Sequence, residues 1–401
     1  MMRRSDNKLA VQFGAGNIGR GLMGQFFWEA GFETIFVDTN AVLVGHLNEQ
    51  GSYPLRLLDA YTRTPQEFTI DRFQAFSTEE SATVAEMIAQ AEMVATAVGV
   101  ANLDAVGPLL AEGIRARLER AAGPLDVYLC ENMLGAASKL SENVGSLLDG
   151  PVRGWAEENV GFVGMSVARI VGGTGTRSPQ DDPLLVVADA HRSIPYDRRA
   201  VRADRPDIDA LHPVRNFQAE VERKIFTHNI GHASLAYLGY LRGFTYVHEA
   251  IDDDGVRSIF DGALDETTAA LLHRYRADLD RREHMRIRQD VRIRFGNPLL
   301  RDGIARVARD PIRKLGRNDR IAGAAELCIS CGVVPEHIAI VCAAALCFDC
   351  PDDPQATRLQ NTIQQHGQQE TLRRLSGIEP ASEFGRRVSE HYDRLQSDRT
   401  R

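Results

Sequence analysis

Short apolar runs alternate with helical patterns in the first half of the chain. The run Leu9–Phe13 has the length of a buried strand, and residues 34–37 form a second run of this kind. Between them, an apolar-periodic stretch that ends near Trp28 predicts a helix. This unit of strand, turn, helix and strand is long enough for a right-handed crossover between parallel strands.

The same alternation continues along the chain. Residues 93–98 and 127–129 predict further strands, while residues 81–91 and 101–120 predict helices. Strands that alternate with helices indicate an α/β fold, so we expect a doubly wound, Rossmann-type parallel sheet in the N-terminal part.

The pattern changes after about residue 195, where strand-like runs become rare. Helical periodicity dominates from there, at residues 221–241, 262–276 and 335–348. A chain of 401 residues exceeds what one hydrophobic core usually serves. We therefore predict a Rossmann-type domain at residues 1–195 and a mostly α-helical domain at residues 196–401. The turn-rich segment 172–182 is expected to form a loop.

The turn after the first predicted strand has the pattern of a dinucleotide-binding loop. In such a loop the first glycine permits a tight turn, the second lets a pyrophosphate approach the backbone, and the third allows close packing of helix and strand. The helix that follows presents backbone N–H groups to the anion. The turn consists of Gly14, Ala15, Gly16, Asn17, Ile18 and Gly19.

Asp38 stands at the end of the second predicted strand, about 20 residues beyond the turn, where a carboxylate accepts hydrogen bonds from an adenosine ribose. The same carboxylate would repel a 2′-phosphate, so the expected cofactor is NAD. The alternative is a plain glycine turn with Asp38 capping a loop. We favour the dinucleotide site, because strand, turn, helix and acid occur in the required order.

An amine, an amide and an imidazole lie close together in the helical half of the chain. Lys224, Asn229 and His232 are spaced so that they can face one side of a helix. Oxidation of an alcohol needs a base for the hydroxyl proton and donors that stabilise negative charge on oxygen. A lysine can be this base if burial or nearby cations lower its pKa. Spacing alone does not distinguish this catalytic arrangement from a surface lysine beside an interior asparagine and histidine.

At these residues the sequence resembles the polyol-specific long-chain dehydrogenases of the mannitol dehydrogenase family, most closely its mannitol-1-phosphate 5-dehydrogenases. The resemblance covers most of the chain. Its motifs are the glycine turn within residues 13–21, Cys130-Glu131-Asn132, Gly161-Phe162-Val163, Lys224-x4-Asn229-x2-His232, Gly296-Asn297-Pro298, the segment from Arg306 to Lys314, and residues 343–346 and 352–355.

The resemblance implies a role for each residue of the cluster. Lys224 would be the general base, Asn229 and Asn132 would be amide donors to the reacting oxygen, and His232 would contact that oxygen or its neighbour. The implied reaction is reversible oxidation of mannitol 1-phosphate to fructose 6-phosphate, with hydride passing to NAD and no metal ion.

Two cations further along the chain would hold the polar chain of the substrate. By the resemblance these are Arg306 and Lys314. Charge alone would favour an ordinary basic helix face at both positions.

One position departs from the family pattern. Ala168 stands where the family usually has an acid near the base. This leaves two alternatives open. One is a related polyol or sugar-acid (uronate) oxidoreductase of the same family, and the other is a non-catalytic NAD(H)-binding redox sensor.

Four of the six cysteines have the spacing of a zinc ribbon, in the pairs Cys328/Cys331 and Cys347/Cys350. Between the pairs runs a continuous apolar helical pattern that contains Cys342, and a buried cysteine behaves as a small hydrophobe. We favour buried thiols over structural zinc, and over disulfides in a reducing compartment.

The charge balance limits the possible partners. A formal net charge of -8 disfavours binding to nucleic acid, and the basic run 281–294 has the spacing of a solvated helix face. The sequence shows neither a secretory signal nor an apolar run of membrane-spanning length. We expect a cytoplasmic monomer or small homo-oligomer whose partner is a small polyol phosphate.

Overall fold

The computed structural model describes residues 8–131, 133, 135–172, 181–204 and 206–399 of the chain. Two compact units are present, with the first ending at Glu220 and the second beginning at Val221, to which Ala60–Arg63 also belongs. The boundary between the two units lies within helix α7 (Phe217–Lys224), further along the chain than the boundary expected near residue 195. The reason is that two late strands, β10 (Ile194–Asp197) and β11 (Leu211–Val214), belong to the first unit. Most of the loop expected at 172–182 lies outside the described residues.

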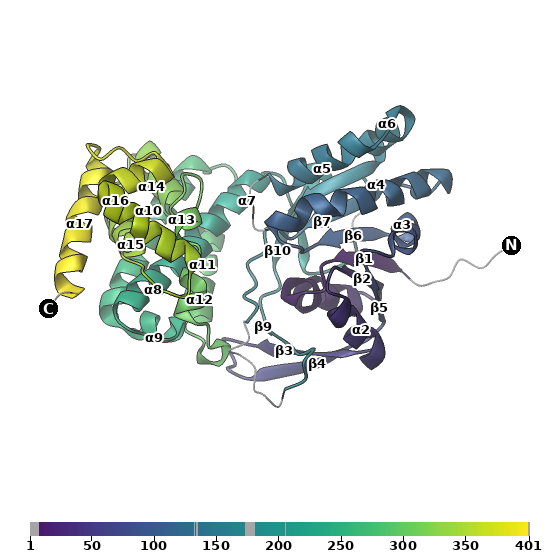
Figure 1. Ribbon diagram of the computed structural model, residues 1–401, viewed down its shortest axis with the longest axis horizontal. Helices are drawn as coiled ribbons and strands as arrows, with labels where there is room; N and C mark the ends of the chain where they lie inside the picture. Colours follow the sequence, from purple (N-terminus) through teal and green to yellow (C-terminus); the bar gives the residue numbers. More distant parts are fainter. Residues whose placement is uncertain (1–7, 132, 134, 173–180, 205, 400–401) are drawn as a thin grey trace. The chain divides into compact units, whose positions relative to one another are not determined.

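The first unit is built on a six-stranded sheet in which every neighbouring pair is parallel (Figure 1). This confirms the predicted fold class. The strand order is β5 (Phe73–Ser77), β2 (Glu33–Asp38), β1 (Leu9–Phe13), β6 (Met93–Thr96), β7 (Leu125–Leu129) and β8 (Val160–Gly164). The order reverses direction between β1 and β6, and ligands of such sheets bind at the carboxyl ends of the strands beside this point.

The two outer strands were not predicted from the sequence. Strand β5 alternates apolar residues with Gln74 and Ser77, and β8 begins and ends close to glycines, at Gly161 and Gly164. Neither segment is a continuous apolar run, because an edge strand needs less apolar surface than a central one. The central strands are buried on both faces and therefore stand out in the sequence.

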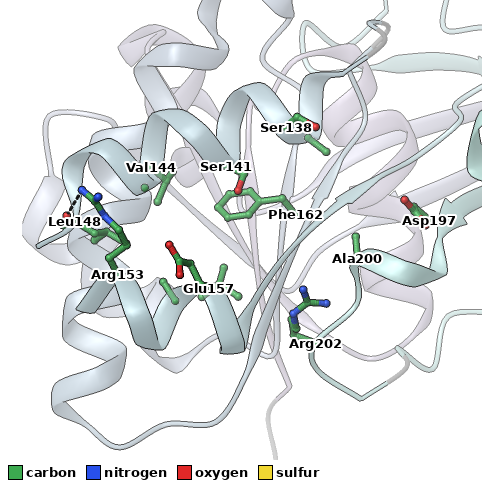
Figure 2. Close-up of a pocket in the computed structure, with 14 residues that line it drawn as sticks. Ser138, Ser141, Val144, Leu148, Arg153, Glu157, Phe162, Asp197, Ala200 and Arg202 are labelled. Atoms are coloured by element: carbon green, nitrogen blue, oxygen red, sulfur yellow. Dashed lines mark hydrogen bonds between the residues drawn. The ribbon is translucent and has the colours of Figure 1, made fainter. Parts of the chain in front are cut away.

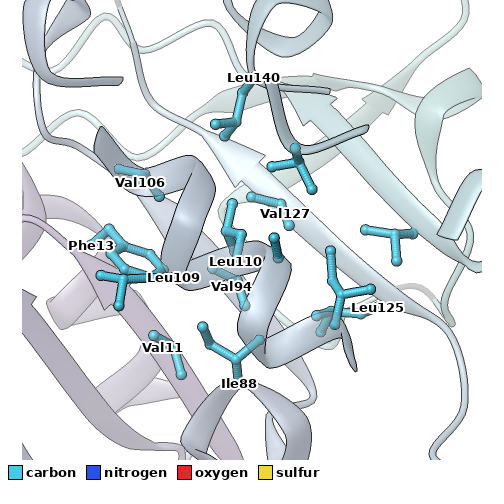
Figure 3. Packing of buried hydrophobic residues seen from close by; sticks show 14 of the residues in the cluster. Val11, Phe13, Ile88, Val94, Val106, Leu109, Leu110, Leu125, Val127 and Leu140 are labelled. Carbon is cyan, nitrogen blue, oxygen red and sulfur yellow. The ribbon is translucent and has the colours of Figure 1, made fainter. Parts of the chain in front are cut away.

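Helices pack against both faces of the sheet. On one face, alternate strand residues such as Val11, Val94 and Val127 contact Leu110 of α4 and Leu140 of α5 (Figure 3). Burial of each such side chain contributes about 1.5–3 kcal/mol. The helices of this unit are η1 (a π-helical turn, Gly19–Gly24), α1 (Gln25–Glu29), α2 (Ala41–Gln50), α3 (Ser81–Gln90), α4 (Leu103–Glu119), α5 (Ala136–Leu147) and α6 (Gly150–Asn159).

Two small sheets complete the first unit. Strand β3 (Tyr53–Leu58) pairs antiparallel with β4 (Pro65–Ile70) and parallel with β9 (Val186–Asp189). Strands β10 and β11 pair with each other in parallel. Apolar residues of β10 and β11 pack against the second face of the main sheet, next to η1 and α1.

The second unit is helical in its described part, as predicted. Helix α8 lies among the others and is buried along most of its length. The basic run expected to be a helix forms α11, where Arg288 and Arg292 pair with acids of α10. The helices are η5 (a π-helical turn, Ile225–Asn229), α8 (Ile230–Leu241), α9 (Val247–Asp252), α10 (Asp254–Arg274), α11 (Arg281–Phe295), α12 (Ile304–Ala308), α13 (Pro311–Lys314), α14 (Ala322–Ser330), α15 (Glu336–Leu346), α16 (Pro354–Ser376) and α17 (Glu383–Arg399).

Within the described part of the chain, every helix is either too short or too polar to cross a membrane.

Candidate functional site

The predicted dinucleotide turn lies at the carboxyl end of β1, beside the reversal of strand order. Gly14 has φ +87°, and a Cβ added there would lie 2.5 Å from the carbonyl oxygen of Ala97. A Cβ at Gly19 would lie 1.8 Å from the carbonyl oxygen of Gly14, so helix and strand could not approach as they do. A Cβ at Gly16 would meet nothing within 4 Å. The backbone at Gly16 is therefore open, as the approach of a pyrophosphate requires.

Asp38 is the last residue of β2 and its carboxylate holds the turn. Its Oδ2 accepts a hydrogen bond from the Ala15 N–H at 2.7 Å, and its Oδ1 accepts one from the Asn40 N–H at 2.9 Å. Asn17 donates to the Gly172 carbonyl oxygen at 3.5 Å, while Ile18 packs into the core. Each carboxylate oxygen has two lone pairs, so Asp38 keeps acceptor capacity for a ribose.

Glu131 lies at this edge of the sheet, and the sequence analysis named it only within the motif Cys130-Glu131-Asn132, without a role. It follows β7, and its two carboxylate oxygens accept hydrogen bonds from the Val98 N–H at 3.1 Å and the Gly99 N–H at 3.0 Å. Gly99 has φ +84°, a backbone conformation that favours glycine, and this carboxylate fixes the loop after β6 in it. The neighbouring Asn132, expected to be an amide donor, lies outside the described residues.

In the second unit, Lys224 and Asn229 flank a widened helical turn. Helices α7, η5 and α8 are consecutive, and the Ile230 N–H bonds to the carbonyl oxygen of Ile225, five residues earlier. In a regular α-helix, residues five apart point about 140° away from each other. A π turn closes this angle, and such turns are frequent at functional sites.

Burial lowers the pKa of the Lys224 amine to about 7. The positive charges of Arg320 and Arg313 contribute to this lowering of the pKa, and the negative charge of Asp319 opposes it. The residue nevertheless keeps partial solvent exposure. A large share of the amine is consequently unprotonated at neutral pH, as a base must be.

Asn229 is buried, and its side-chain amide makes no hydrogen bond with any described residue. A buried amide usually has a partner, so this one is available to a ligand.

His232 is held by two contacts. Its Nε2 lies 2.8 Å from Oδ2 of Asp302, and its ring stacks on Phe295 with centroids 4.7 Å apart. Burial lowers the pKa of His232, although the hydrogen bond with Asp302 opposes this. The imidazole is therefore mainly neutral at neutral pH, with Nδ1 left for a ligand.

Asp302, which sequence reasoning missed, joins His232 to Arg306. Its Oδ1 accepts from Nε of Arg306 at 3.1 Å, and the side chain is 8 % exposed. Burial raises the pKa of Asp302, but the contacts with His232 and Arg306 outweigh it, so this pKa lies below its usual value. Arg306 is thus engaged with a carboxylate.

Lys314 is buried, and its amine already donates hydrogen bonds within the chain. Its Nζ donates to the carbonyl oxygen of Val307 at 2.5 Å and to that of Arg309. Burial, followed by the positive charges of Arg320 and Arg313, lowers the pKa of Lys314 to about 7. Its part in substrate binding stays a prediction.

The cysteines of the zinc-ribbon pattern lie in and between helices. Burial raises the pKa of Cys328, Cys342 and Cys347 to about 12, which favours the thiol over the thiolate that zinc requires. Within the described ranges, no cluster of three or more His, Cys, Asp or Glu side chains is arranged to hold a metal ion.

The first unit also has a hollow of about 370 Å³ at the β8 edge of its sheet (Figure 2). Ser138 and Ser141 of α5, Arg153 and Glu157 of α6, and Phe162 of β8 line it. Strands β6 and β7 separate this edge from β1, and none of the predicted site residues lines the hollow.

Comparison with known families matches both halves of the chain. The model of the mannitol dehydrogenase Rossmann domain matches residues 8–210, and that of the mannitol dehydrogenase C-terminal domain matches residues 216–396.

Similar sequences include two bacterial proteins named mannitol-1-phosphate 5-dehydrogenase. The one from Brevibacillus brevis is 39 % identical over 97 % of this chain and 98 % of its own length. The one from Bacillus licheniformis is 36 % identical over 96 % of this chain and 99 % of its own length.

Similar solved structures have the same fold at low sequence identity. Pseudomonas fluorescens mannitol 2-dehydrogenase, in a ternary complex with NAD and D-mannitol, is 18 % identical with a TM-score of 0.74 and covers 98 % of this chain and 93 % of its own. A substrate-free D-sorbitol dehydrogenase is 15 % identical with a TM-score of 0.78, covering 98 % of this chain and 96 % of its own.

Proposed function

Because the chain belongs to the mannitol dehydrogenase family, we propose that it is an NAD-dependent oxidoreductase that interconverts mannitol 1-phosphate and fructose 6-phosphate with Lys224 as base. The substrate follows from the names of the relatives above 30 % identity. The observation that carries the chemistry is the Lys224 amine with a pKa of about 7.

Lys224 accepts the hydroxyl proton of the polyol at Nζ and returns it in the reverse reaction. At the same time the carbon-bound hydrogen leaves as hydride, and negative charge develops on the substrate oxygen. The buried Asn229 amide donates to that oxygen, and Asn132 would be the second donor. His232, whose Nε2 donates to Asp302, has Nδ1 as an acceptor, which orients the reacting hydroxyl before its proton leaves or a neighbouring hydroxyl of the substrate.

The residues of the first unit fit NAD. The open backbone at Gly16 accommodates a pyrophosphate, and Asp38 keeps lone pairs for ribose hydroxyls while repelling a 2′-phosphate. When bound, NAD accepts the hydride. The scheme needs no metal ion, because an amine with a pKa near 7 accepts the proton. We also expect, from the sequence, a cytoplasmic protein.

Ala168 motivated the alternative of a redox sensor without catalysis. The second unit supplies an acid of its own, since Asp319 acts on the pKa of Lys224. A lysine whose pKa is set by burial and by neighbouring charges is typical of a catalytic site, so it favours the enzyme over the sensor.

The test is NADH oxidation with fructose 6-phosphate by wild type and Lys224→Ala. We expect turnover by the wild type and a loss of about 10²–10⁴-fold in the variant, the usual contribution of a general base. Lys139→Ala, an exposed lysine on α5, is the matched control and should turn over like wild type. Activity of the wild type should survive dialysis against a chelator.

Three results contradict the proposal. Full activity of Lys224→Ala removes the assigned base. Turnover of a uronate but not of fructose 6-phosphate moves the substrate to the sugar acids, and tight NADH binding without any turnover favours the sensor.

A further inference from the structure

Two buried arginines of the chain differ in the hydrogen bonds that their guanidinium groups donate. Arg117 donates to the carbonyl oxygens of a set of loop and helix residues, namely Ile88, Ala89, Ala91, Gly123 and Pro124. The side chain of Arg320 is 9 % exposed, yet its one side-chain hydrogen bond to a described residue runs from Nε to Asp319 at 2.7 Å. Its two Nη groups donate to no described residue, and they are not among the fully buried polar atoms, so they remain accessible to a ligand.

Asp319 fixes the orientation of this guanidinium. Its Oδ1 accepts both the Arg320 backbone N–H at 2.6 Å and Nε, while its Oδ2 accepts Nη1 of Arg313 at 3.0 Å. The bond at Nε fixes the plane of the guanidinium and leaves the two Nη groups at its end as parallel donors.

Arg320 belongs to the same part of the second unit as the proposed base. A side chain at Gly323 would come within 3.2 Å of the Phe226 ring, so the start of α14 approaches the π turn that follows Lys224 closely. The charge of Arg320 lowers the pKa of Lys224 and of Lys314. With Arg313 these side chains form a cluster of four basic groups, which outnumber its two carboxylates, Asp310 and Asp319.

The cations expected from the sequence to hold the substrate are already engaged. Arg306 pairs with Asp302, and Lys314 bonds to two backbone carbonyl oxygens. Arg320 is the arginine of this cluster that combines deep burial with uncommitted donors among the described residues.

We propose that Arg320, oriented by Asp319, binds the phosphate group of a sugar-phosphate substrate through its two Nη groups. The inference rests on the proposed function, since that function supplies a phosphorylated substrate. A planar guanidinium with parallel donors matches two phosphate oxygens, and a dianion offsets the excess positive charge of the cluster. Arg320 therefore distinguishes phosphorylated from free sugars.

The experiment compares wild type, Arg320→Gln, Arg320→Lys and the control Arg317→Gln, an exposed arginine close by in sequence. For each, kcat and KM are measured with NADH for fructose 6-phosphate and for fructose, together with inhibition by inorganic phosphate. We expect Arg320→Gln to lower kcat/KM for fructose 6-phosphate by about 10–100-fold, mainly through KM, and that for fructose by less than about threefold. Inhibition by phosphate should weaken in parallel, Arg320→Lys should fall between, and Arg317→Gln should match wild type.

An equal loss for both sugars, or unchanged inhibition by phosphate, overturns the assignment of Arg320 while leaving the reaction intact. If the wild type does not reduce fructose 6-phosphate, the proposed function fails first. Calorimetric titration of the protein with inorganic phosphate, with and without the Arg320→Lys change, then still decides whether Arg320 binds the anion. The same titration serves if Arg320→Gln does not fold.

Discussion

The glycine turn after β1 and the π turn after Lys224 are both tight features next to a helix, but different forces define them. At the glycine turn the backbone itself is the site: Gly14 and Gly19 have no room for a side chain, while the open space at Gly16 leaves room for a pyrophosphate. At the π turn the site is a set of side chains, and their properties come from burial and from charges elsewhere in the chain. Steric requirements leave a mark in the local sequence, whereas electrostatic ones do not.

The largest effect that separates these two kinds of site is expected from Gly19→Ala. The added Cβ would lie 1.8 Å from the Gly14 carbonyl oxygen, so the turn must open. We expect NADH binding to become undetectable by fluorescence titration and the protein to lose about 1–3 kcal/mol of stability, as overpacking does.

Gly16→Ala is the matched control for that substitution. Since nothing lies within 4 Å of the added Cβ, the thermal midpoint should stay that of wild type, while the methyl group weakens NADH binding at least about tenfold by obstructing the pyrophosphate. If Gly16→Ala bound NADH normally, the pyrophosphate would not approach there.

A smaller effect is expected from Asp302→Asn in the second unit. The carboxylate holds His232 and Arg306 by charge-assisted bonds, each worth about 1.5–3 kcal/mol. We expect kcat/KM for fructose 6-phosphate to fall roughly 10–100-fold, with NADH affinity unchanged. Asp265→Asn, an exposed partner of Arg288, should have no effect. A loss of NADH affinity in Asp302→Asn would show that the two sites do not depend on separate residues.

The sequence predicted most of the fold and the local part of each site. The four central strands and helices such as α4, α8 and α15 were predicted correctly because buried strands and amphipathic helices have a regular apolar pattern, whereas the polar α16 was not predicted. The glycine turn was predicted because its pattern lies within six consecutive residues. Lys224, Asn229 and His232 were predicted as a cluster from their spacing and from the family resemblance.

What the sequence missed depends on contacts between distant residues. Asp302 lies 70 positions from His232, and Glu131 lies 33 positions from the backbone N–H of Val98 that it binds. Neither pairing follows from spacing. Arg320 was not identified from the sequence, because its burial and the lack of Nη partners among the described residues become visible only in the folded chain. No local sequence rule predicts the π turn.

The most direct test of the account is the pH dependence of kcat/KM for mannitol 1-phosphate oxidation. Oxidation requires the neutral Lys224 amine, so we predict that kcat/KM rises about tenfold per pH unit below pH 7 and levels off above it, in accordance with a pKa of about 7. Reduction of fructose 6-phosphate requires the protonated amine and should decline above the same pH. An oxidation profile that shows no ionisation near pH 7 and keeps rising toward the ordinary lysine value of 10.5 would contradict the claim that Lys224 is a base adjusted by burial and neighbouring charge.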